Sequence, residues 1–428
     1  MKSTITCDME GIIETMNSGA EKIFGYEKDE LIGKKRVSIF SPGEIVLQNV
    51  ASWLDTAVKK GEYIGETIFI RKDGEKINAK IRITPTFKNG KNNPQTGYCG
   101  VTEIIDKEVN VTISFLTKMI KWLAITRMPF STASIFPIIL TASYFAYAGD
   151  NLFITSNLLL CVFSILFIHL SINVFNDYFD FIDGTDEGNT EYFQQLSGGS
   201  RAIELGLISV KKTKKLAIFL CIISIFLGIL LCLNIFHTNL ISVIILAAIG
   251  LFLGYFYTAK PLRLVARRGL GELSIFLTFG PILTLGTGFA IFNGDLLANF
   301  EHLFNCLILG FPLGFLTTNI LLINQFPDRE GDIKTGKNHL VVTFGKRKSR
   351  WIYLIIFISF VSTAIYFSSS INNSLSLIPT VISSIFGFYV IKQIFINYNN
   401  RKLIRANWST IYLHTIYAIT LIIILLIS

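Results

Sequence analysis

The sequence has few charged residues and lacks the marks of several protein classes. Charged side chains make up 16% of its 428 residues, whereas a soluble globular protein has about 25%. The first twenty residues contain no sustained apolar core, so no secretory signal peptide is predicted there. The cysteines are scattered singly, which argues against a disulfide framework or a zinc site and predicts free thiols. They are Cys7, Cys99, Cys161, Cys221, Cys232 and Cys306.

Basic residues are unevenly distributed along the chain. The net charge is +9, yet residues 1–110 contain as many acidic as basic side chains, so the whole excess lies in the remainder. The basic residues therefore follow membrane topology rather than forming a stripe on a soluble domain, and no nucleic-acid partner is predicted.

Hydrophobic residues dominate the part of the chain after Phe130. They form nine runs of about 17–24 residues, each long enough to cross a hydrocarbon core of about 30 Å. The sequence thus predicts a multi-pass α-helical membrane protein with a soluble N-terminal part. The predicted spans are Phe130–Ala148, Leu152–Phe175, Leu216–Phe236, Leu240–Tyr257, Leu270–Phe292, Leu303–Ile323, Trp351–Phe367, Leu375–Phe395 and Trp408–Ile427.

The loops between these spans predict the orientation. Lys and Arg follow the second, fourth, sixth and eighth spans, and none follows the first, third, fifth or seventh. By the positive-inside rule, we expect the basic loops and the N-terminal domain on the cytoplasmic side of the cell membrane.

An acidic cluster, residues 173–186, directly follows the second span. Asn173, Asp177 and Asp180 are spaced i, i+4 and i+7, so they share one face if the helix continues past the span. Carboxylates at a membrane are costly unless they are paired, bound to metal or exposed to water. This cluster is therefore a candidate functional site.

A second cluster, residues 324–332, ends the sixth span on the same side. Asp328 and Asp332 lie one helical turn apart. Oxygen side chains suit Mg²⁺, which typically takes one or two carboxylates together with phosphate oxygens and water. Either cluster alone is compatible with a helix cap or a solvated turn, but the pair predicts that Mg²⁺ and a diphosphate bind between them.

Basic residues near the clusters have two readings. Lys260 and Arg263 follow the fourth span beside an aromatic turn. They would either bind a diphosphate or only place this loop on the cytoplasmic side, and we favour diphosphate binding. For the basic residues within 211–215 and 346–348, we favour a role in membrane topology alone.

The N-terminal residues 1–108 predict a small α+β domain. Residues 64–70 and 76–84 predict two strands joined by an Asp-Gly turn, and Ser18–Phe24 before Gly25 predicts a short helix. Together with Asn17, Glu30-Leu31-Ile32-Gly33 and Gly100-Val101-Thr102-Glu103-Ile104, these motifs resemble the PAS sensor domain over nearly all of residues 5–106. No histidine precedes His169, which excludes a proximal haem ligand, and neither cysteine here has the flavin-adduct motif. Ligand sensing and partner binding both remain open.

Residues 109–128 join the two parts. Val109, Ile113, Leu116, Ile120 and Leu123 recur at helical spacing, which predicts an amphipathic helix on the membrane surface. Such a helix would transmit a signal or act as a tether, and we favour the tether.

Residues 129–428 resemble the UbiA superfamily of intramembrane prenyltransferases. The resemblance depends on both clusters and on motifs outside them. These motifs are Arg127-Met128-Pro129-Phe130, Ser197-Gly198-Gly199-Ser200-Arg201, Gly269-Leu270-Gly271-Glu272 and Gly336-Lys337. The set is most similar to the branch that prenylates 1,4-dihydroxy-2-naphthoate for menaquinone. The sequence departs from other branches at two positions. Gly184 stands where the ubiquinone branch commonly has an aspartate. Phe256 stands where some relatives have a tyrosine, so Tyr255 or Tyr257 would have to take its role, or the role is absent.

The resemblance implies Mg²⁺-dependent transfer of a polyprenyl group from its diphosphate to an aromatic acceptor. The implied metal ligands are Asp177, Asp180, Asp186, Asp328 and Asp332. The implied catalytic residues are Asp177, Asp180, Asp328, Asp332 and Lys260. The implied diphosphate-binding residues are Asn173, Asn176, Arg201, Arg263, Asn324 and Lys337.

Two other protein classes compete with this interpretation. A membrane receptor needs fewer than nine spans for its anchor, and no output domain is visible in the sequence. A transporter usually binds its substrate near the membrane midplane, whereas these carboxylates lie at the surface. Within the enzyme class, the alternative is another aromatic or quinone precursor as acceptor.

Overall fold

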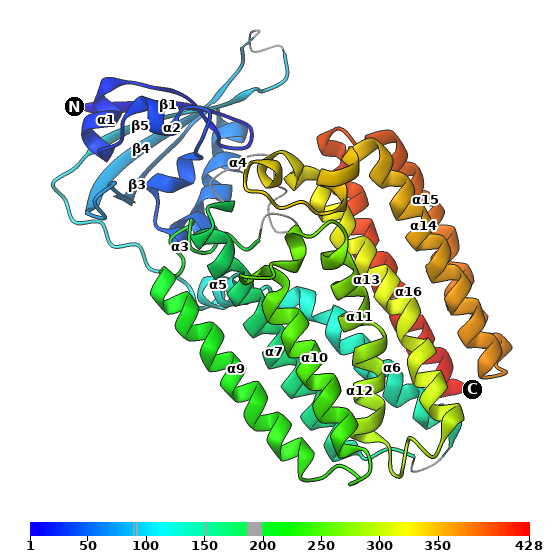
Figure 1. The fold of residues 1–428 in the computed structure, drawn as a ribbon. Helices are drawn as coiled ribbons and strands as arrows, with labels where there is room; N and C mark the ends of the chain where they lie inside the picture. Colours follow the sequence, from blue (N-terminus) through cyan, green and yellow to red (C-terminus); the bar gives the residue numbers. More distant parts are fainter. Residues whose placement is uncertain (89, 91–92, 150–151, 186–198) are drawn as a thin grey trace. The chain divides into compact units, whose positions relative to one another are not determined.

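The computed structural model describes residues 1–88, 90, 93–149, 152–185 and 199–428. The chain divides into two compact units, residues 1–125 with 201–210 and residues 126–200 with 211–428. Residues 201–210, which the sequence assigned to the membrane domain, thus group with the first unit. Figure 1 shows the elements of both units.

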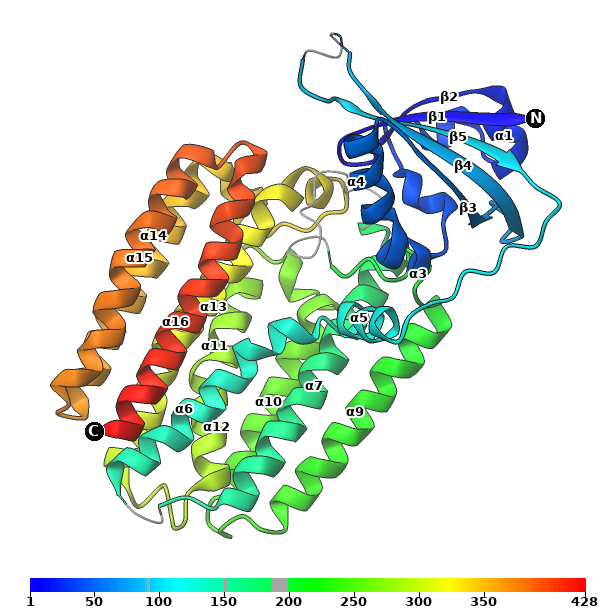
Figure 2. The ribbon, with the colours of Figure 1, turned by 180° about the vertical axis from the view of Figure 1, so that it is seen from behind.

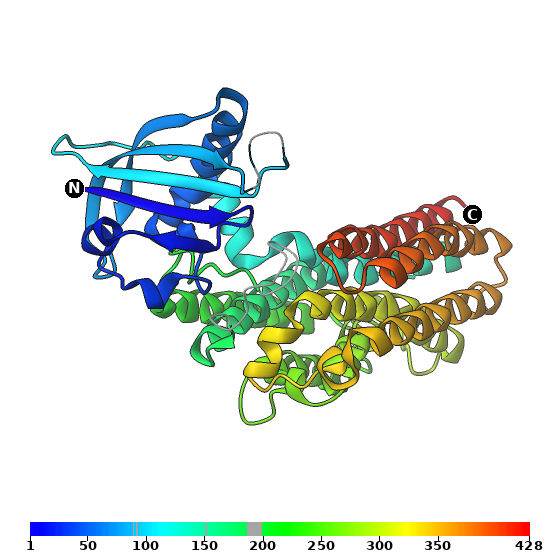
Figure 3. The same cartoon turned by 90° about the horizontal axis from the view of Figure 1, so that it is seen from above.

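The first unit contains a five-stranded antiparallel sheet in the order β2-β1-β5-β4-β3, whose strands lie side by side in Figure 3. The strands are β1 (Lys2–Asp8), β2 (Ile13–Met16), β3 (Tyr63–Ile70), β4 (Lys76–Thr86) and β5 (Gly97–Ile104). The helices are α1 (Ser18–Phe24), α2 (Lys28–Leu31), η1 (Val37–Phe40), α3 (Gly43–Ile45), the π-helix η2 (Val46–Val50), α4 (Ala51–Lys60) and α5 (Phe115–Thr126).

Local sequence signals explain this unit well. The predicted hairpin is confirmed, because β3 pairs with β4 from Tyr63–Ile83 to Ile70–Lys76, and the turn glycine Gly74 has φ 89°. The predicted short helix is α1, which ends where Gly25 adopts a left-handed conformation. Alternating residues of the strands pack with α1 and α4 into one core. All six cysteines are free, and burial raises the pKa of Cys7 to about 11, so it is a neutral thiol.

The linker helix is shorter than predicted. It begins at Phe115 rather than at residue 109, because Val111 and Ile113 pack against the core of the first unit. Ser114 then caps the helix by accepting a hydrogen bond from the Thr117 N–H at 3.1 Å. The periodicity of residues 109–113 therefore reflects packing of an extended segment, and the prediction of a helix there was wrong.

The second unit contains all nine predicted spans. Within the described residues, nine helices are long and apolar enough to cross a membrane. They are α6 (Thr132–Ala148, after η3, Met128–Ser131), α7 (Thr155–Ile182), α9 (Val210–Cys232), α10 (Leu240–Thr258), α11 with α12 (Leu270–Phe279 and Pro281–Ile291), α13 (Phe300–Lys334), α14 (Leu340–Ser370), α15 (Leu377–Asn397) and α16 (Ile404–Ile427). Short 3₁₀ turns are η4 (Leu264–Ala266), η5 (Ser374–Ser376) and η6 (Arg401–Leu403).

Helix α13 is the central element of this unit. It is the most buried of the nine spans, and it packs against α11, α12, α14 and α16. Figure 2 shows α16 and α13 beside each other from behind. The fifth span is broken at Gly280, before Pro281, where a Cβ would lie 2.6 Å from the carbonyl oxygen of Gly310. Glycines thus let α13 approach the break closely, as is common between membrane helices.

The connections between spans contact one another at two separate ends of the bundle. At one end, Arg267 of the α10–α11 connection bridges to Asn338 of the α13–α14 connection. At the other end, Phe153 bridges to Phe292. The loops that contain Lys and Arg belong to the first end, and the two acidic clusters lie there as well.

Candidate functional site

The first acidic cluster lies on the last turns of α7, which continues to Ile182 as predicted. Asn173, Asp177 and Asp180 therefore share one helical face. Asp183 caps the end of this helix, and Gly184 follows in a left-handed conformation with φ 69°. The apolar length of the span and the polar cluster thus belong to a single helix.

Asp177 is buried at 5% exposure and is held by a glycine-serine turn. The backbone N–H of Ser200 donates to Asp177 Oδ1 at 3.0 Å, and the Ser200 hydroxyl donates to Oδ2. Gly199 has φ 75°, and a Cβ there would lie 2.8 Å from Asp177 Oδ1. Only glycine lets the chain approach this carboxylate so closely.

Lys337 connects the two acidic clusters. It follows the end of α13, where Gly336 with φ 70° turns the chain back. Its Nζ lies 2.8 Å from Oδ1 and 2.9 Å from Oδ2 of Asp180 on α7, and both side chains are largely buried. Segments more than 150 positions apart therefore meet in one site.

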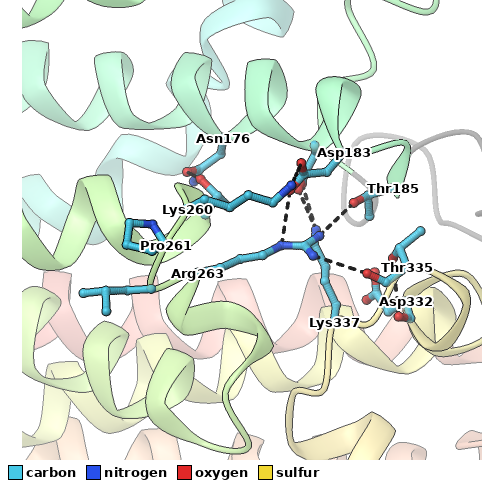
Figure 4. A network of polar contacts seen from close by, with 12 residues as sticks. Asn176, Asp183, Thr185, Lys260, Pro261, Arg263, Asp332, Thr335 and Lys337 are labelled. Carbon is cyan, nitrogen blue, oxygen red and sulfur yellow. Dashed lines mark hydrogen bonds and ion pairs between the residues drawn. The ribbon is translucent and has the colours of Figure 1, made fainter.

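Asp183 joins the cations of the α10–α11 loop to this site, as Figure 4 shows. Lys260 Nζ lies 2.8 Å from Asp183 Oδ1, and Arg263 Nε lies 3.5 Å from Oδ2. Arg263 also donates to the carbonyl oxygen of Thr335, next to the second cluster, and to the hydroxyl of Thr185. Lys260 remains 73% exposed, whereas Arg263 is 15% exposed.

Asp332 is buried against a histidine. His339 Nε2 lies 2.9 Å from Asp332 Oδ2, and the His339 side chain is 1% exposed. The same histidine caps α14, since its Nδ1 accepts a hydrogen bond from the Val342 N–H at 3.3 Å. Asp328 lies one turn earlier on α13 and is partly buried.

The three predicted asparagines make contacts that position the helices. Asn173 donates to the carbonyl oxygen of Thr126 at 3.3 Å. Asn176 accepts a 2.6 Å hydrogen bond from Thr258 at the end of α10. Asn324 accepts one from Asn407 on α16 at 2.8 Å. Their role toward a diphosphate stays a prediction.

Two further predicted residues are Asp186 and Arg201. Asp186 lies outside the described residues. Arg201 belongs to the first unit, where its guanidinium pairs with Glu204 at 2.8 Å. The diphosphate-binding role of Arg201 stays a prediction.

Of Tyr255 and Tyr257, the structure favours Tyr257 as the tyrosine near the site. The ring of Tyr255 packs against Phe175 and Phe179 and is 43% exposed. Tyr257 is partly buried and directly precedes Thr258, whose hydroxyl donates to Asn176 of the first cluster.

The donor set fits Mg²⁺ that is shared with a substrate. Carboxylate oxygens are the ligands that Mg²⁺ prefers, and Mg²⁺ usually retains water and phosphate oxygens. The described residues contain no three His, Cys, Asp or Glu side chains placed to hold a metal ion by themselves. One or two carboxylates from each cluster, completed by phosphate oxygens, would give a donor set of the kind that Mg²⁺ prefers.

Three polar partners of the site were not predicted from the sequence. The sequence singled out neither Asp183 nor His339, and Ser200 was only part of a motif. Spacing along α7 carries a signal for Asp183, which lies three residues after Asp180. No spacing rule pairs Ser200 with Asp177 or His339 with Asp332, because loops bring these residues together.

The fold and the site define a multi-pass membrane protein whose acidic and basic side chains meet at one end of a helical bundle. The model of the UbiA prenyltransferase family matches residues 135–416, and a PAS domain model matches residues 2–105. The chain belongs to the UbiA prenyltransferase family, and its N-terminal part is a PAS domain.

Relatives and a solved structure agree with this assignment. The chain is 27% identical over 234 residues to the chloroplastic 2-carboxy-1,4-naphthoquinone phytyltransferase of Arabidopsis thaliana, covering 54% of this chain and 56% of that protein. It is 28% identical over 256 residues to the 1,4-dihydroxy-2-naphthoate octaprenyltransferase of Haemophilus influenzae, covering 58% and 75%. The apo structure of a UbiA homologue from Aeropyrum pernix K1 superimposes with TM-score 0.52 at 11% identity, covering 68% of this chain and 97% of that one. The chain therefore spans little more than half of the plant relative.

Proposed function

We propose that this protein transfers a polyprenyl group from an allylic polyprenyl diphosphate to 1,4-dihydroxy-2-naphthoate, with Mg²⁺ as cofactor. The observation that carries the proposal is the contact between Lys337 and Asp180, which joins two acidic segments and a cation in one site. The names of the two sequence relatives support a naphthoate-type acceptor. We further propose that this end of the bundle faces the cytoplasm across the plasma membrane, since its loops contain the Lys and Arg residues.

The carboxylates would hold Mg²⁺ from two sides. Asp177 and Asp180 would bind the metal from α7, and Asp328 and Asp332 would bind it from α13. Asp186 is proposed as a fifth ligand. Bound Mg²⁺ draws charge off the diphosphate and so favours cleavage of the allylic C–O bond. Ser200 and His339 would fix the orientation of Asp177 and Asp332, because ligating carboxylates need such partners.

Three cations would bind the diphosphate itself. Lys260, Arg263 and Lys337 all pair with carboxylates of α7 or its cap, and each would exchange that partner for phosphate oxygens. Cations placed where negative charge develops stabilise the leaving group in the transition state. Arg263, which also bonds the carbonyl oxygen of Thr335, would hold the loops around the leaving group.

The acceptor and the prenyl chain need different surroundings. The chain would lie among the apolar side chains of the spans, while the ring reaches the allylic carbon near the clusters. As the C–O bond breaks, the electron-rich ring forms a C–C bond with the allylic carbon, and the acceptor's carboxylate leaves as CO₂. The diphosphate departs with the electron pair of the broken bond.

Tyr257→Phe is expected to lower kcat by about 10- to 100-fold, because we propose that its hydroxyl would donate to the bound diphosphate, and a hydrogen bond to a charged group contributes about 1.5–3 kcal/mol. Tyr255→Phe is the matched control, since it removes the same atom from a ring packed on phenylalanines, and we expect unchanged turnover. Rates would be measured with radiolabelled polyprenyl diphosphate in isolated membranes. Equal effects of the two variants would remove Tyr257 from the site.

Mass spectrometry of quinones tests the proposed reaction. A host that lacks its own naphthoate prenyltransferase would receive this chain, and we expect prenylated naphthoquinone to reappear. The host without the chain is the control. If the protein accumulates in the membrane and only another prenylated aromatic compound appears, the acceptor assignment is wrong. If no prenylated product appears, the transferase assignment is wrong.

A further inference from the structure

Glu272 is a buried carboxylate that has no part in the proposed binding of Mg²⁺ and diphosphate. It lies in the first turn of α11, within the motif Gly269-Leu270-Gly271-Glu272, and only 4% of the residue is exposed. A glutamate in this position stabilises the helix dipole, but it does so on the protein surface as well. Because moving a carboxylate out of water is unfavourable unless it is paired, the dipole alone does not explain the burial.

Only one oxygen of this carboxylate has hydrogen-bond donors. Oε1 accepts from Gln325 Nε2 on α13 at 3.0 Å and from the Leu340 N–H at the start of α14 at 2.9 Å. Oε2 is buried, and no described residue donates a hydrogen bond to it or forms an ion pair with Glu272. A buried acceptor without a donor is unfavourable, and native proteins contain few of them. Oε2 is therefore a candidate for a donor that comes from a ligand.

The partners of Glu272 place it beside the second acidic cluster. Gln325, Asp328 and Asp332 are spaced i, i+3 and i+7 along α13 and so share one face of that helix. Glu272 bonds the first residue of this face, whose own Oε1 is also buried without a hydrogen-bond partner in the described part of the chain. The N–H group that Glu272 binds on α14 belongs to the residue after His339, whose ring bonds Asp332. Glu272 thus contacts both segments that hold the proposed metal ligands of α13.

Of the groups in the proposed reaction, a ring hydroxyl suits Oε2 best. The diphosphate is negatively charged and offers oxygen acceptors, and the prenyl chain has no donor. A metal site that joins Glu272 to Asp328 and Asp332 is not formed, because the described residues place no three His, Cys, Asp or Glu side chains together for a metal ion. The proposed acceptor has two hydroxyl donors. One of them can bond the acceptor's own neighbouring carboxylate, so the other, at position 4 of the ring, is free to donate.

We propose that Glu272 binds the aromatic acceptor, with Oε2 accepting a hydrogen bond from the hydroxyl at position 4. The inference rests on the proposed function, because it takes a hydroxylated naphthoate as the acceptor. Glu272 also repels the acceptor's carboxylate, which favours the orientation in which the hydroxyl faces Oε2. A site that hydrogen-bonds a substrate hydroxyl discriminates against analogues that lack it, since its polar group is then left unpaired. Glu272 is thus a specificity-determining residue for hydroxylated acceptors.

Glu272→Gln tests this role in turnover. The amide oxygen can still accept from Gln325 and Leu340, while the amide NH₂ group takes the place of Oε2 and cannot accept. We expect kcat/KM for 1,4-dihydroxy-2-naphthoate to fall about 10- to 100-fold, the loss of one hydrogen bond to a charged group. The KM for polyprenyl diphosphate and the Mg²⁺ requirement should stay unchanged, which separates acceptor binding from a general defect.

The matched control is Glu301→Gln. Glu301 is exposed in the first turn of α13, at the end of that helix remote from the clusters, and its variant should retain the wild-type kcat/KM. A raised Mg²⁺ requirement of Glu272→Gln with an unchanged KM for the acceptor would make Glu272 a metal ligand and overturn the proposal. An equal loss of affinity for polyprenyl diphosphate and for the acceptor would make its role structural, which would also overturn the proposal.

A binding measurement distinguishes this inference from the proposed function. The probes are 4-hydroxy-2-naphthoate and 2-naphthoate, which differ only in the hydroxyl, titrated by fluorescence against the full chain in nanodiscs. We expect Glu272→Gln to raise the Kd of the hydroxylated probe about 10- to 100-fold and not to raise that of 2-naphthoate. This result supports the inference even if the wild-type protein transfers no prenyl group. Equal binding of 4-hydroxy-2-naphthoate by both proteins, together with wild-type transfer, rejects the inference and leaves the proposed function intact.

Discussion

Asp177→Asn is expected to lower prenyl transfer by about three orders of magnitude in membranes that still contain the protein. The exchange removes one negative charge at a buried position, and a metal ion in such a site contributes several kcal/mol of charge stabilisation to the transition state. The amide has the same shape as the carboxylate, and its oxygen still accepts a hydrogen bond from Ser200. The loss should therefore be one of chemistry and not of folding.

The matched control is Asp295→Asn. Asp295 lies in the α12–α13 connection at the other end of the bundle, where it accepts a hydrogen bond from the Leu297 N–H at 3.0 Å. We expect its variant to retain wild-type transfer, with both proteins present at equal amounts by immunoblot. Retained turnover in Asp177→Asn would contradict the two-sided metal site.

The membrane architecture could be predicted from the sequence because it depends on local quantities. Apolar length determined the spans, and a period of 3.6 residues placed Asn173, Asp177 and Asp180 on one face of α7. The hairpin β3–β4 followed in the same way from alternation and an Asp-Gly turn. Each of these features is determined by residues within about 20 positions of one another.

The break in the fifth span was not predicted from the sequence. Gly280 and Pro281 permit a break, and the close approach of α13 requires a glycine there, since Gly310 occupies the space that a Cβ on Gly280 would need. The start of α5 was missed for a related reason. Val111 and Ile113 have helical spacing, yet packing on the PAS core holds them in an extended segment.

The polar partners of the carboxylates depend on contacts between distant segments. The sequence identified Asp180, Asp332 and Lys337 as site residues, but nothing in it pairs Lys337 with Asp180 or His339 with Asp332. It also assigned residues 201–210 to the membrane domain, because the motif at 197–201 adjoins the first cluster. The structure instead groups the segment with the first unit, through contacts with Gly43, which lies more than 150 positions away in the sequence.

Lys337→Met is expected to lower kcat by about 100- to 1000-fold, the usual loss when one donor to a developing negative charge is removed. Methionine retains most of the apolar stem, so the change removes the ammonium group with little change in packing. Lys334→Met is the matched control, because Lys334 is exposed on the last turn of α13 and should retain wild-type kcat. Rates would be measured at saturating Mg²⁺ and polyprenyl diphosphate.

A double-mutant cycle with Asp180→Asn identifies what Lys337 does. In Lys337→Met the carboxylate of Asp180 loses its cation, and leaving one member of a buried pair alone costs about 3–5 kcal/mol. Because Asp180 is itself a proposed metal ligand, the effect of Lys337→Met on turnover is compared in the wild-type and Asp180→Asn backgrounds. If Lys337 binds the departing diphosphate, as we propose, Lys337→Met lowers turnover further in the Asp180→Asn background, although the stability lost in Lys337→Met recovers there. Recovered stability with no further loss of turnover would assign Lys337 a purely structural role.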